Sequence, residues 1–188
     1  MKWFGLIFAL LILVAVAAMF PIMVKNGLIE QDESVSEAWS QIDTQLQRRA
    51  DLVPNLVSTV KGYAAHEKEV FIAVADARSK LLAAKSPAMK ASASGLLSGA
   101  LGRLMAISEN YPQLKADASF VRLQDELTGT ENRIAVTRMR YNKVVKQFNA
   151  SIRKFPGSIF ADGLELSKAE YYEPPSNLNV DVVPEVTF

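Results

Sequence analysis

The stretch VSEAWSQIDTQLQRRADLVPNLVSTVKGY, residues 35–63, carries the clearest structural pattern in the chain. Its apolar side chains recur at alternating steps of four and three residues, which places them on one face of a helix. They are Val35, Trp39, Ile42, Leu46, Val53, Leu56, Val60 and Tyr63, and Arg49 fills the one position between Leu46 and Val53. The pattern predicts a long helix from a cap at Asp32–Ser34 to about Gly62, packed on partner helices through this stripe.

Two residues interrupt this stripe. Pro54 lacks an N–H and its ring clashes with the Ala50 carbonyl, but the pattern continues in phase beyond it, so we expect a bend and not a stop. Arg49 would be a costly charge if it were buried without a partner. Glu131 lies beside the apolar stripe of a later helix that would cross the first near its middle if the two were antiparallel. We therefore predict an Arg49–Glu131 ion pair.

Upstream of the stripe, residues 3–24 form an apolar run of 22 residues without a charge. At about 1.5 Å per residue, a helix of this length spans a hydrocarbon core of about 30 Å. Lys25 closes the run, and Asn26–Gly27 can end the helix. The run predicts an N-terminal transmembrane anchor over residues 1–25.

A cleaved secretory signal is the alternative interpretation of the same run. Lys2 precedes it, and Ala15-Val16-Ala17 resembles a small-residue cleavage site. The apolar run continues past that site to Val24, which is longer than a usual signal core. We therefore favour an anchor that is not cleaved.

Downstream, three further helices are expected, from His66–Glu67 to Ser86–Pro87, from Pro87 to Asn110, and from Asp117 to about Lys154. Their apolar stripes are Val70, Val74, Ala77 and Leu81; then Leu97, Ala100, Leu101, Leu104 and Ile107; then Phe120, Leu123, Leu127, Ile134, Tyr141, Val144, Phe148 and Phe155. Because short connections make consecutive helices antiparallel neighbours, the fold class is all-α, with a four-helix bundle over residues 26–155. Pro and Gly residues predict an extended C-terminal tail over residues 156–188, with room for one strand-like piece around Leu178–Val182.

Composition excludes several kinds of chemistry. The chain has no Cys and a single histidine, His66, so it lacks the ligand sets of zinc, haem, iron–sulfur and di-iron centres, and we expect no metal and no cofactor. Its 21 basic and 20 acidic residues create no field that would attract nucleic acid. Gly95, Gly99 and Gly102 are not a P-loop, because the required lysine and hydroxyl residue are absent after the last glycine; they predict close helix packing.

Several strings of the sequence resemble the signature of the LemA family. They are AWSQID (38–43), RRADLVPNLV (48–57), VKGY (60–63), HE (66–67), ENYPQLKA (109–116), LQDEL (123–127), ENRIA (131–135) and RYN (140–142). The resemblance implies a bacterial protein with an N-terminal membrane anchor and a helical bundle, in a family without an established enzymatic activity. It also implies similarity to proteins linked with magnetosome membranes, and membrane proteases among the candidate partners.

We therefore hypothesise a non-enzymatic, membrane-anchored scaffold or partner-binding protein. The alternative is a hydrolase or lipid-modifying enzyme that uses His66 with Glu67 or Asp51, and this hypothesis requires a pocket around His66. Lys2 and the terminal amine outweigh Lys25 in charge, which favours a single pass through the cytoplasmic membrane with the bundle on the extracytoplasmic side.

The unequal helix lengths suggest where a partner would bind. The second and third helices are too short to cover the membrane-proximal half of the first and fourth, so an apolar surface should remain there. It would consist of Val35, Trp39, Ile42, Tyr141, Val144 and Phe148. A second copy or a membrane protein is the expected occupant, and the chain's own tail is the alternative.

The C-terminal half of the fourth helix predicts contact with lipid. Residues 133–154 contain no acid, and their basic side chains include Arg140, Lys143, Lys146, Arg153 and Lys154. An antiparallel bundle returns this half toward the bilayer, where each cation near an anionic surface contributes about 1 kcal/mol. We expect these five residues to face lipid headgroups.

Overall fold

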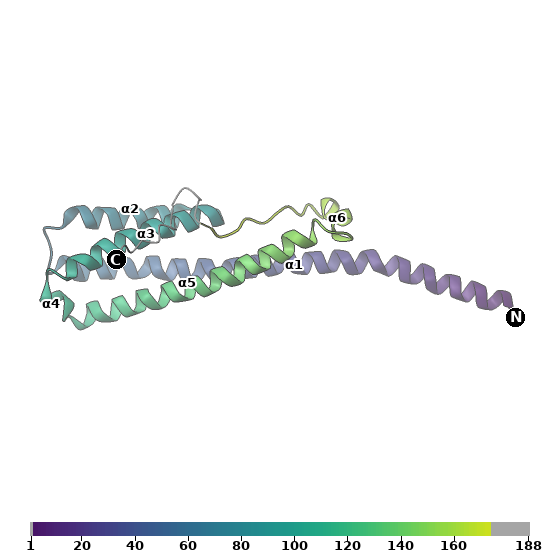
Figure 1. Ribbon diagram of the computed structural model, residues 1–188, viewed down its shortest axis with the longest axis horizontal. Coiled ribbons are helices and arrows are strands. Elements are labelled where there is room, and N and C mark those ends of the chain that lie inside the picture. The colour runs from purple at the N-terminus through teal and green to yellow at the C-terminus, as the bar shows by residue number, and fades with distance from the viewer. Residues whose placement is uncertain (1, 174–188) are drawn as a thin grey trace, which may run out of the picture. The chain divides into compact units, whose positions relative to one another are not determined.

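The computed structural model describes residues 2–173, apart from the side chains of residues 2, 5, 6, 9 and 14–17. Within this range every regular element is a helix, as the sequence predicted (Figure 1). The elements are α1 (Lys2–Lys61), α2 (Lys68–Ala83), α3 (Pro87–Ser108), α4 (Pro112–Lys115), α5 (Ala118–Ser151), α6 (Gly157–Phe160) and the 3₁₀ helix η1 (Asp162–Leu164). The strand-like piece expected around Leu178–Val182 lies outside the described residues.

The first helix is a single element of 60 residues. The predicted break at Asn26–Gly27 and the predicted cap at Asp32–Ser34 are therefore wrong. One interior glycine destabilises a helix by only about 1 kcal/mol. Burial of apolar side chains close to Gly27, such as Leu28, can offset this cost. Ser34 does not cap a helix, because its hydroxyl donates to the Glu30 carbonyl at 2.8 Å, one turn back in the same helix. The helix continues through Pro54, as expected.

The chain forms two compact units. Among the described residues, the bundle unit comprises residues 41–139 and 170–173, so it contains the second part of α1, all of α2 to α4 and the first part of α5. Its core is drawn from all four long helices and includes Ile42, Leu46, Val53, Leu56, Val74, Leu81, Leu97, Leu104, Phe120 and Leu127. Within this unit Arg49 meets Glu131 and Tyr63 meets Asp117, so α1 and α5 are antiparallel.

The predicted stripes match the core of the bundle unit closely. All five apolar residues expected to be buried on α3 are buried. On α2, Phe71 is buried in place of Val70, and the other three expected positions are correct. Ser86 caps α3 by accepting a hydrogen bond from the Met89 N–H, and Pro87 occupies the first helical turn, where its missing N–H costs little.

Among the described residues, the anchor unit comprises residues 2–40 and 140–169, and it contains the first part of α1, the end of α5, α6 and η1. Its buried side chains include Leu28, Val35, Ala38, Tyr141, Val145, Phe148, Ile152 and Ala161. Trp39 packs on Tyr141 with ring centroids 5.5 Å apart. Val145, and not Val144, completes the apolar face of α5, because the helical steps from Tyr141 run four, three and four residues to Ile152.

The first part of the tail is helical, which corrects the prediction of an extended segment from residue 156. Helices α6 and η1 cover residues 157–164, and only residues 165–173 are irregular in the described range. A side chain at Gly157 would overlap the Ser151 carbonyl, so this turn requires glycine. Asn149 then holds the tail, since its Nδ2 donates to the Ala169 carbonyl and its Oδ1 accepts from the Ala169 N–H, both at 2.9 Å.

Candidate membrane-facing and partner-binding surfaces

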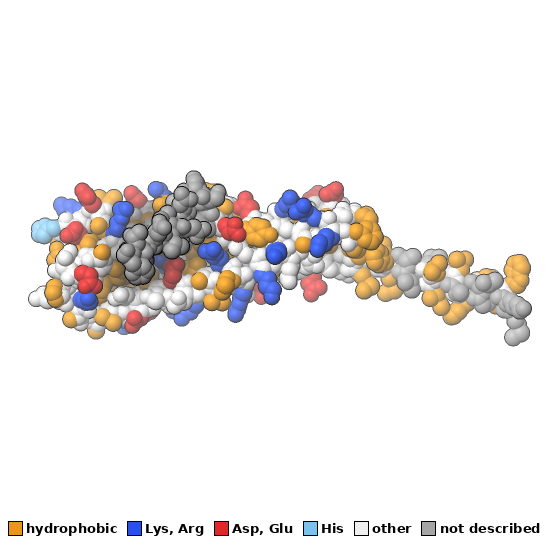
Figure 2. Space-filling model, in the orientation of Figure 1, with side chains coloured by type: hydrophobic (Ala, Val, Ile, Leu, Met, Phe, Trp, Pro, Cys, Tyr) orange, Lys and Arg blue, Asp and Glu red, His pale blue; other side chains and the backbone are white. Residues whose placement is uncertain are grey.

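The apolar start of α1 is exposed along the residues whose side chains the structure describes. Trp3, Phe4, Phe8, Leu11 and Met23 are all more than three-fifths exposed. Figure 2 shows apolar side chains on this part of the helix, and both signs of charge over the rest of the face in view. A helix that is apolar on all sides and not covered by its own chain is typical of a membrane segment. The helix is long and apolar enough to cross a bilayer.

The predicted partner surface is largely internal. Val35, Tyr141 and Phe148 are buried in the anchor unit, and Ile42 is buried in the bundle unit. The expectation that these four residues form an uncovered stripe is therefore wrong. The tail, which was the alternative occupant of this surface, adds α6, η1 and the segment held by Asn149 to the anchor unit. Trp39 and Val144 are half-buried and stay accessible.

The structure brings together the two residues of the predicted ion pair. Arg49 Nη1 lies 2.5 Å from Glu131 Oε2, with the Arg49 side chain 6% and the Glu131 side chain 51% exposed. Burial lowers the pKa of Arg49, and the Glu131 carboxylate opposes this shift. Arg49 Nε makes no hydrogen bond to the described residues, so the guanidinium is only partly compensated.

Tyr172 joins this buried charge from the tail, and sequence reasoning missed it. Its side chain is 3% exposed in the bundle unit. Burial raises the pKa of Tyr172, while a hydrogen bond with Ser94 and the positive charge of Arg49 oppose the rise. No sequence pattern could reveal this contact, because it depends on where an irregular segment crosses α1 and α3.

A second missed residue is Arg78 on α2. Its Nε donates to the Ala50 carbonyl at 2.8 Å. This carbonyl is the one that Pro54, four residues later, cannot satisfy, because proline has no N–H. A side chain from a neighbouring helix thus supplies the hydrogen bond that Pro54 removes from α1.

The five basic residues expected at the membrane surface lie in the anchor unit. Arg140, Lys143 and Lys146 are exposed on α5, and Arg153 and Lys154 are exposed in the turn that follows it. Their contact with lipid headgroups stays a prediction.

The glycines of α3 do not form a close helix contact. Gly95, Gly99 and Gly102 are exposed, and a Cβ at any of them would meet no atom within 4 Å. The expectation of close packing is therefore wrong. The buried apolar residues of α3, such as Leu97, Leu101 and Leu104, lie on the face of the helix that packs on the core. The three glycines lie on the exposed face.

His66 lies in the turn between α1 and α2 and is exposed. Three cavities formed by the described residues are lined by other residues. In the described part of the chain, no group of three or more His, Cys, Asp or Glu side chains lies close enough to hold a metal ion. None of these three cavities provides the pocket that the hydrolase hypothesis requires around His66.

Over residues 2–173 the regular elements are all helices, and one of them is apolar and exposed, which is typical of membrane-associated helical proteins. The comparisons agree with this class. The LemA family model matches residues 38–188. The chain belongs to the LemA family.

Magnetosome proteins are among the proteins to which the chain is similar. The chain is 27% identical to magnetosome protein MamQ 2 of Paramagnetospirillum magneticum and to magnetosome protein MamQ of Magnetospirillum gryphiswaldense. Each alignment covers 86% of this chain and 69% of the relative. It is also 27% identical to protein LemA of Metamycoplasma hominis, over 84% of this chain and 73% of the relative. These relatives support membrane association.

Proposed function

We propose that this protein is a non-enzymatic, membrane-anchored scaffold that binds a second copy of itself or another membrane protein. The observation that carries the proposal is the continuity of α1, which supplies both the exposed apolar run and the core of the bundle unit. One element therefore serves as anchor and as structural support for the protein-binding part. The family and the magnetosome relatives favour a role at a membrane over a catalytic one.

The proposed location is the bacterial cytoplasmic membrane, with the bundle on the extracytoplasmic side. The absence of Cys in the sequence allows a clean test by single-cysteine labelling. Thr128→Cys places a thiol at an exposed position of α5 in the bundle unit. A membrane-impermeant maleimide should label it in intact cells or spheroplasts. Labelling that requires permeabilised membranes would reverse the orientation.

The partner is sought by crosslinking the full chain in native membranes, followed by mass spectrometry. We expect stoichiometric crosslinks to a second copy or to a membrane protein, with membrane proteases among the candidates. Trp39→Ala should lower their yield, because half-buried aromatic side chains dominate many binding surfaces. Ile72→Ala is the control, since it truncates a side chain that is 61% exposed in the other unit. A monomeric protein without crosslinks in native membranes would contradict the scaffold.

A further inference from the structure

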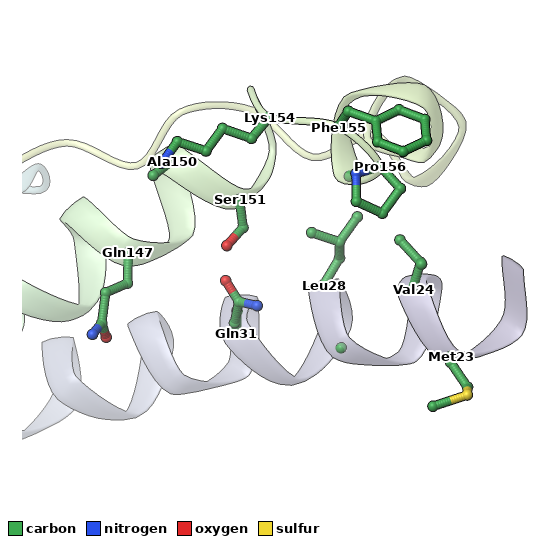
Figure 3. A pocket seen from close by; sticks show the side chains of 12 residues that line it. Met23, Val24, Leu28, Gln31, Gln147, Ala150, Ser151, Lys154, Phe155 and Pro156 are labelled. Carbon is green, nitrogen blue, oxygen red and sulfur yellow. The ribbon is translucent and has the colours of Figure 1, made fainter. Parts of the chain in front are cut away.

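We propose that a cavity within the anchor unit, lined by α1, the end of α5 and the start of α6, binds one anionic phospholipid. This inference rests on the membrane anchoring of the proposed function, but not on the identity of any protein partner. The cavity is bounded by α1, the end of α5 and the turn into α6, and its volume is about 520 Å³ (Figure 3). A volume of this size is ordinary for a site that holds a small ligand or part of a lipid.

The cavity lies where a bilayer surface is expected. Met23 and Val24, two of its lining residues, are the last residues of the apolar run, and Lys25 follows them. On the opposite wall, Phe155 in the turn after α5 is 77% exposed. Ile159 of α6, which does not line the cavity, is 63% exposed in the same unit. Large apolar side chains that a chain leaves uncovered beside its membrane segment are typical of insertion into the interface.

The lining changes from apolar to polar along its length, as a phospholipid does. Figure 3 shows Val24, Phe155 and Pro156 toward one end. The other end carries Gln31 and Gln147, and the side chains of Gln31 and Ser151 face one another. Acyl chains would therefore lie on the side of the membrane segment, and the headgroup on the side of the glutamines.

The charges of the site favour an anionic headgroup. Lys154 is the one charged residue among the described residues that line the cavity. Two further cations lie in the same unit, the exposed Arg153 and Lys25, whose ammonium is 5.8 Å from the centre of the Phe160 ring. Cations at this depth bind a phosphate that is held in the bilayer surface. Free phosphate would not account for the apolar half of the cavity.

Gln31 supplies a further polar contact. Its Oε1 is buried and has no hydrogen-bond partner among the described residues. A buried acceptor that stays unpaired is unfavourable, so we expect the Gln31 amide to turn toward the cavity that it lines and to meet a donor there. A headgroup hydroxyl or ammonium would provide it.

Gly27 provides a way to fill the cavity without disturbing its walls. It lies on the same face of α1 as Val24 and Gln31, it lines the cavity, and a Cβ at this position would meet no atom within 4 Å. Gly27→Leu should therefore occupy the space meant for the ligand. Gly27→Ala adds one methyl group, improves the helix in the same way and leaves most of the space, so it is the matched control.

The test uses the full chain in lipid nanodiscs that contain a photoactivatable phosphatidylglycerol or a photoactivatable phosphatidylcholine with the same acyl chains. We expect the anionic probe to label peptides that contain residues 23–31 and 147–157 in preference to the neutral one. Gly27→Leu should abolish this labelling, and Gly27→Ala should keep it. Lys154→Gln should lower labelling by the anionic probe about fivefold, the effect of one cation at a membrane surface.

Lys68→Gln removes the same charge from an exposed position of α2 in the bundle unit, away from the cavity and from the predicted lipid-facing residues, and it should leave the labelling unchanged. Excess glycerol phosphate should not compete, because it lacks acyl chains. Labelling that is equal for both probes, spread along the chain or insensitive to Gly27→Leu would overturn the proposal. Loss of protein crosslinks with retained lipid labelling would instead contradict the scaffold alone, so the two failures can be distinguished.

Discussion

At the residue scale, Pro54 shows how a tertiary contact can compensate a local defect. Proline in a helix interior leaves the carbonyl four residues earlier without its usual donor. In this chain that carbonyl belongs to Ala50, which is fully buried, and Arg78 from α2 donates to it. The hydrogen bond also ties α2 to the middle of α1, so the proline creates a specific docking point.

Arg78→Met should therefore destabilise the fold by about 1–2 kcal/mol, because it leaves a buried carbonyl unpaired. The same substitution in a Pro54→Ala background should cost clearly less, since residue 54 then has an N–H for the Ala50 carbonyl. Urea unfolding of the full chain in mild detergent, followed by circular dichroism, measures both differences. Equal costs in the two backgrounds would show that Arg78 acts through another contact.

Arg49 is the second residue whose environment decides its effect. Glu131→Gln should cost about 1 kcal/mol, a modest value because the carboxylate is half exposed and screened by water. The loss arises mainly from a buried guanidinium left without its counter-charge. In an Arg49→Met background the same change should cost almost nothing. The double-mutant cycle, measured by urea unfolding, gives the coupling directly, and additive effects would argue against the pair.

At the element scale, Asp117 closes one end of the bundle unit. Its Oδ1 accepts hydrogen bonds from the N–H groups of Ser119 and Phe120, which caps α5, and its Oδ2 accepts from the Tyr63 hydroxyl at 2.9 Å. The Phe120 N–H, followed by the Tyr63 hydroxyl, holds the pKa of Asp117 below its usual value. One carboxylate thus connects the turn after α1 to the start of α5.

This arrangement predicts a pH dependence. Because the pKa of Asp117 is lower in the folded than in the unfolded protein, its contribution is fully present above the unfolded value, about 4, and is lost as the pH falls through the lower folded value. Asp117→Ala should lower the thermal midpoint at pH 7, and the difference from the unaltered protein should shrink near pH 2.5. Thermal unfolding at both pH values tests this, with Asp125→Ala, an exposed acid of α5, as the control. A difference that is independent of pH would exclude the charged cap.

At the scale of the whole molecule, the membrane is expected to act on the anchor unit and not on the bundle unit. The basic residues predicted to face headgroups all lie in the anchor unit, in a stretch of α5 and the following turn that contains no acid. Contact with anionic lipid would hold these residues in place without changing the fold.

Hydrogen exchange of the full chain in nanodiscs should therefore be slower for residues 140–155 in anionic than in neutral lipid. High salt should remove the difference, because it screens exposed charges. Residues 118–139 of the same helix serve as the internal control, and their exchange should depend little on lipid. Exchange at residues 140–155 that is indifferent to both lipid charge and salt would contradict the predicted membrane contact.

The sequence by itself determined the long helices of the bundle unit and most of the core. The periodic stripes of residues 35–63 and of the later helices predicted the buried side chains, because a helix fixes the face on which every third or fourth residue lies. The same periodicity placed Arg49 on a buried stripe and gave Glu131 as its partner. The uncharged run of residues 3–24 likewise indicated a membrane helix from length alone.

The tertiary structure decided what covers each face. The uncovered stripe, the break at Gly27 and the close packing of the α3 glycines were wrong, because each depends on contacts between segments that periodicity does not specify. Arg78 and Tyr172 reach α1 from a different helix and from the tail, at distances along the chain that no local pattern encodes. Local propensity fixes which residues can be buried, whereas burial itself requires a neighbour, and the neighbour is set only when the chain folds back on itself.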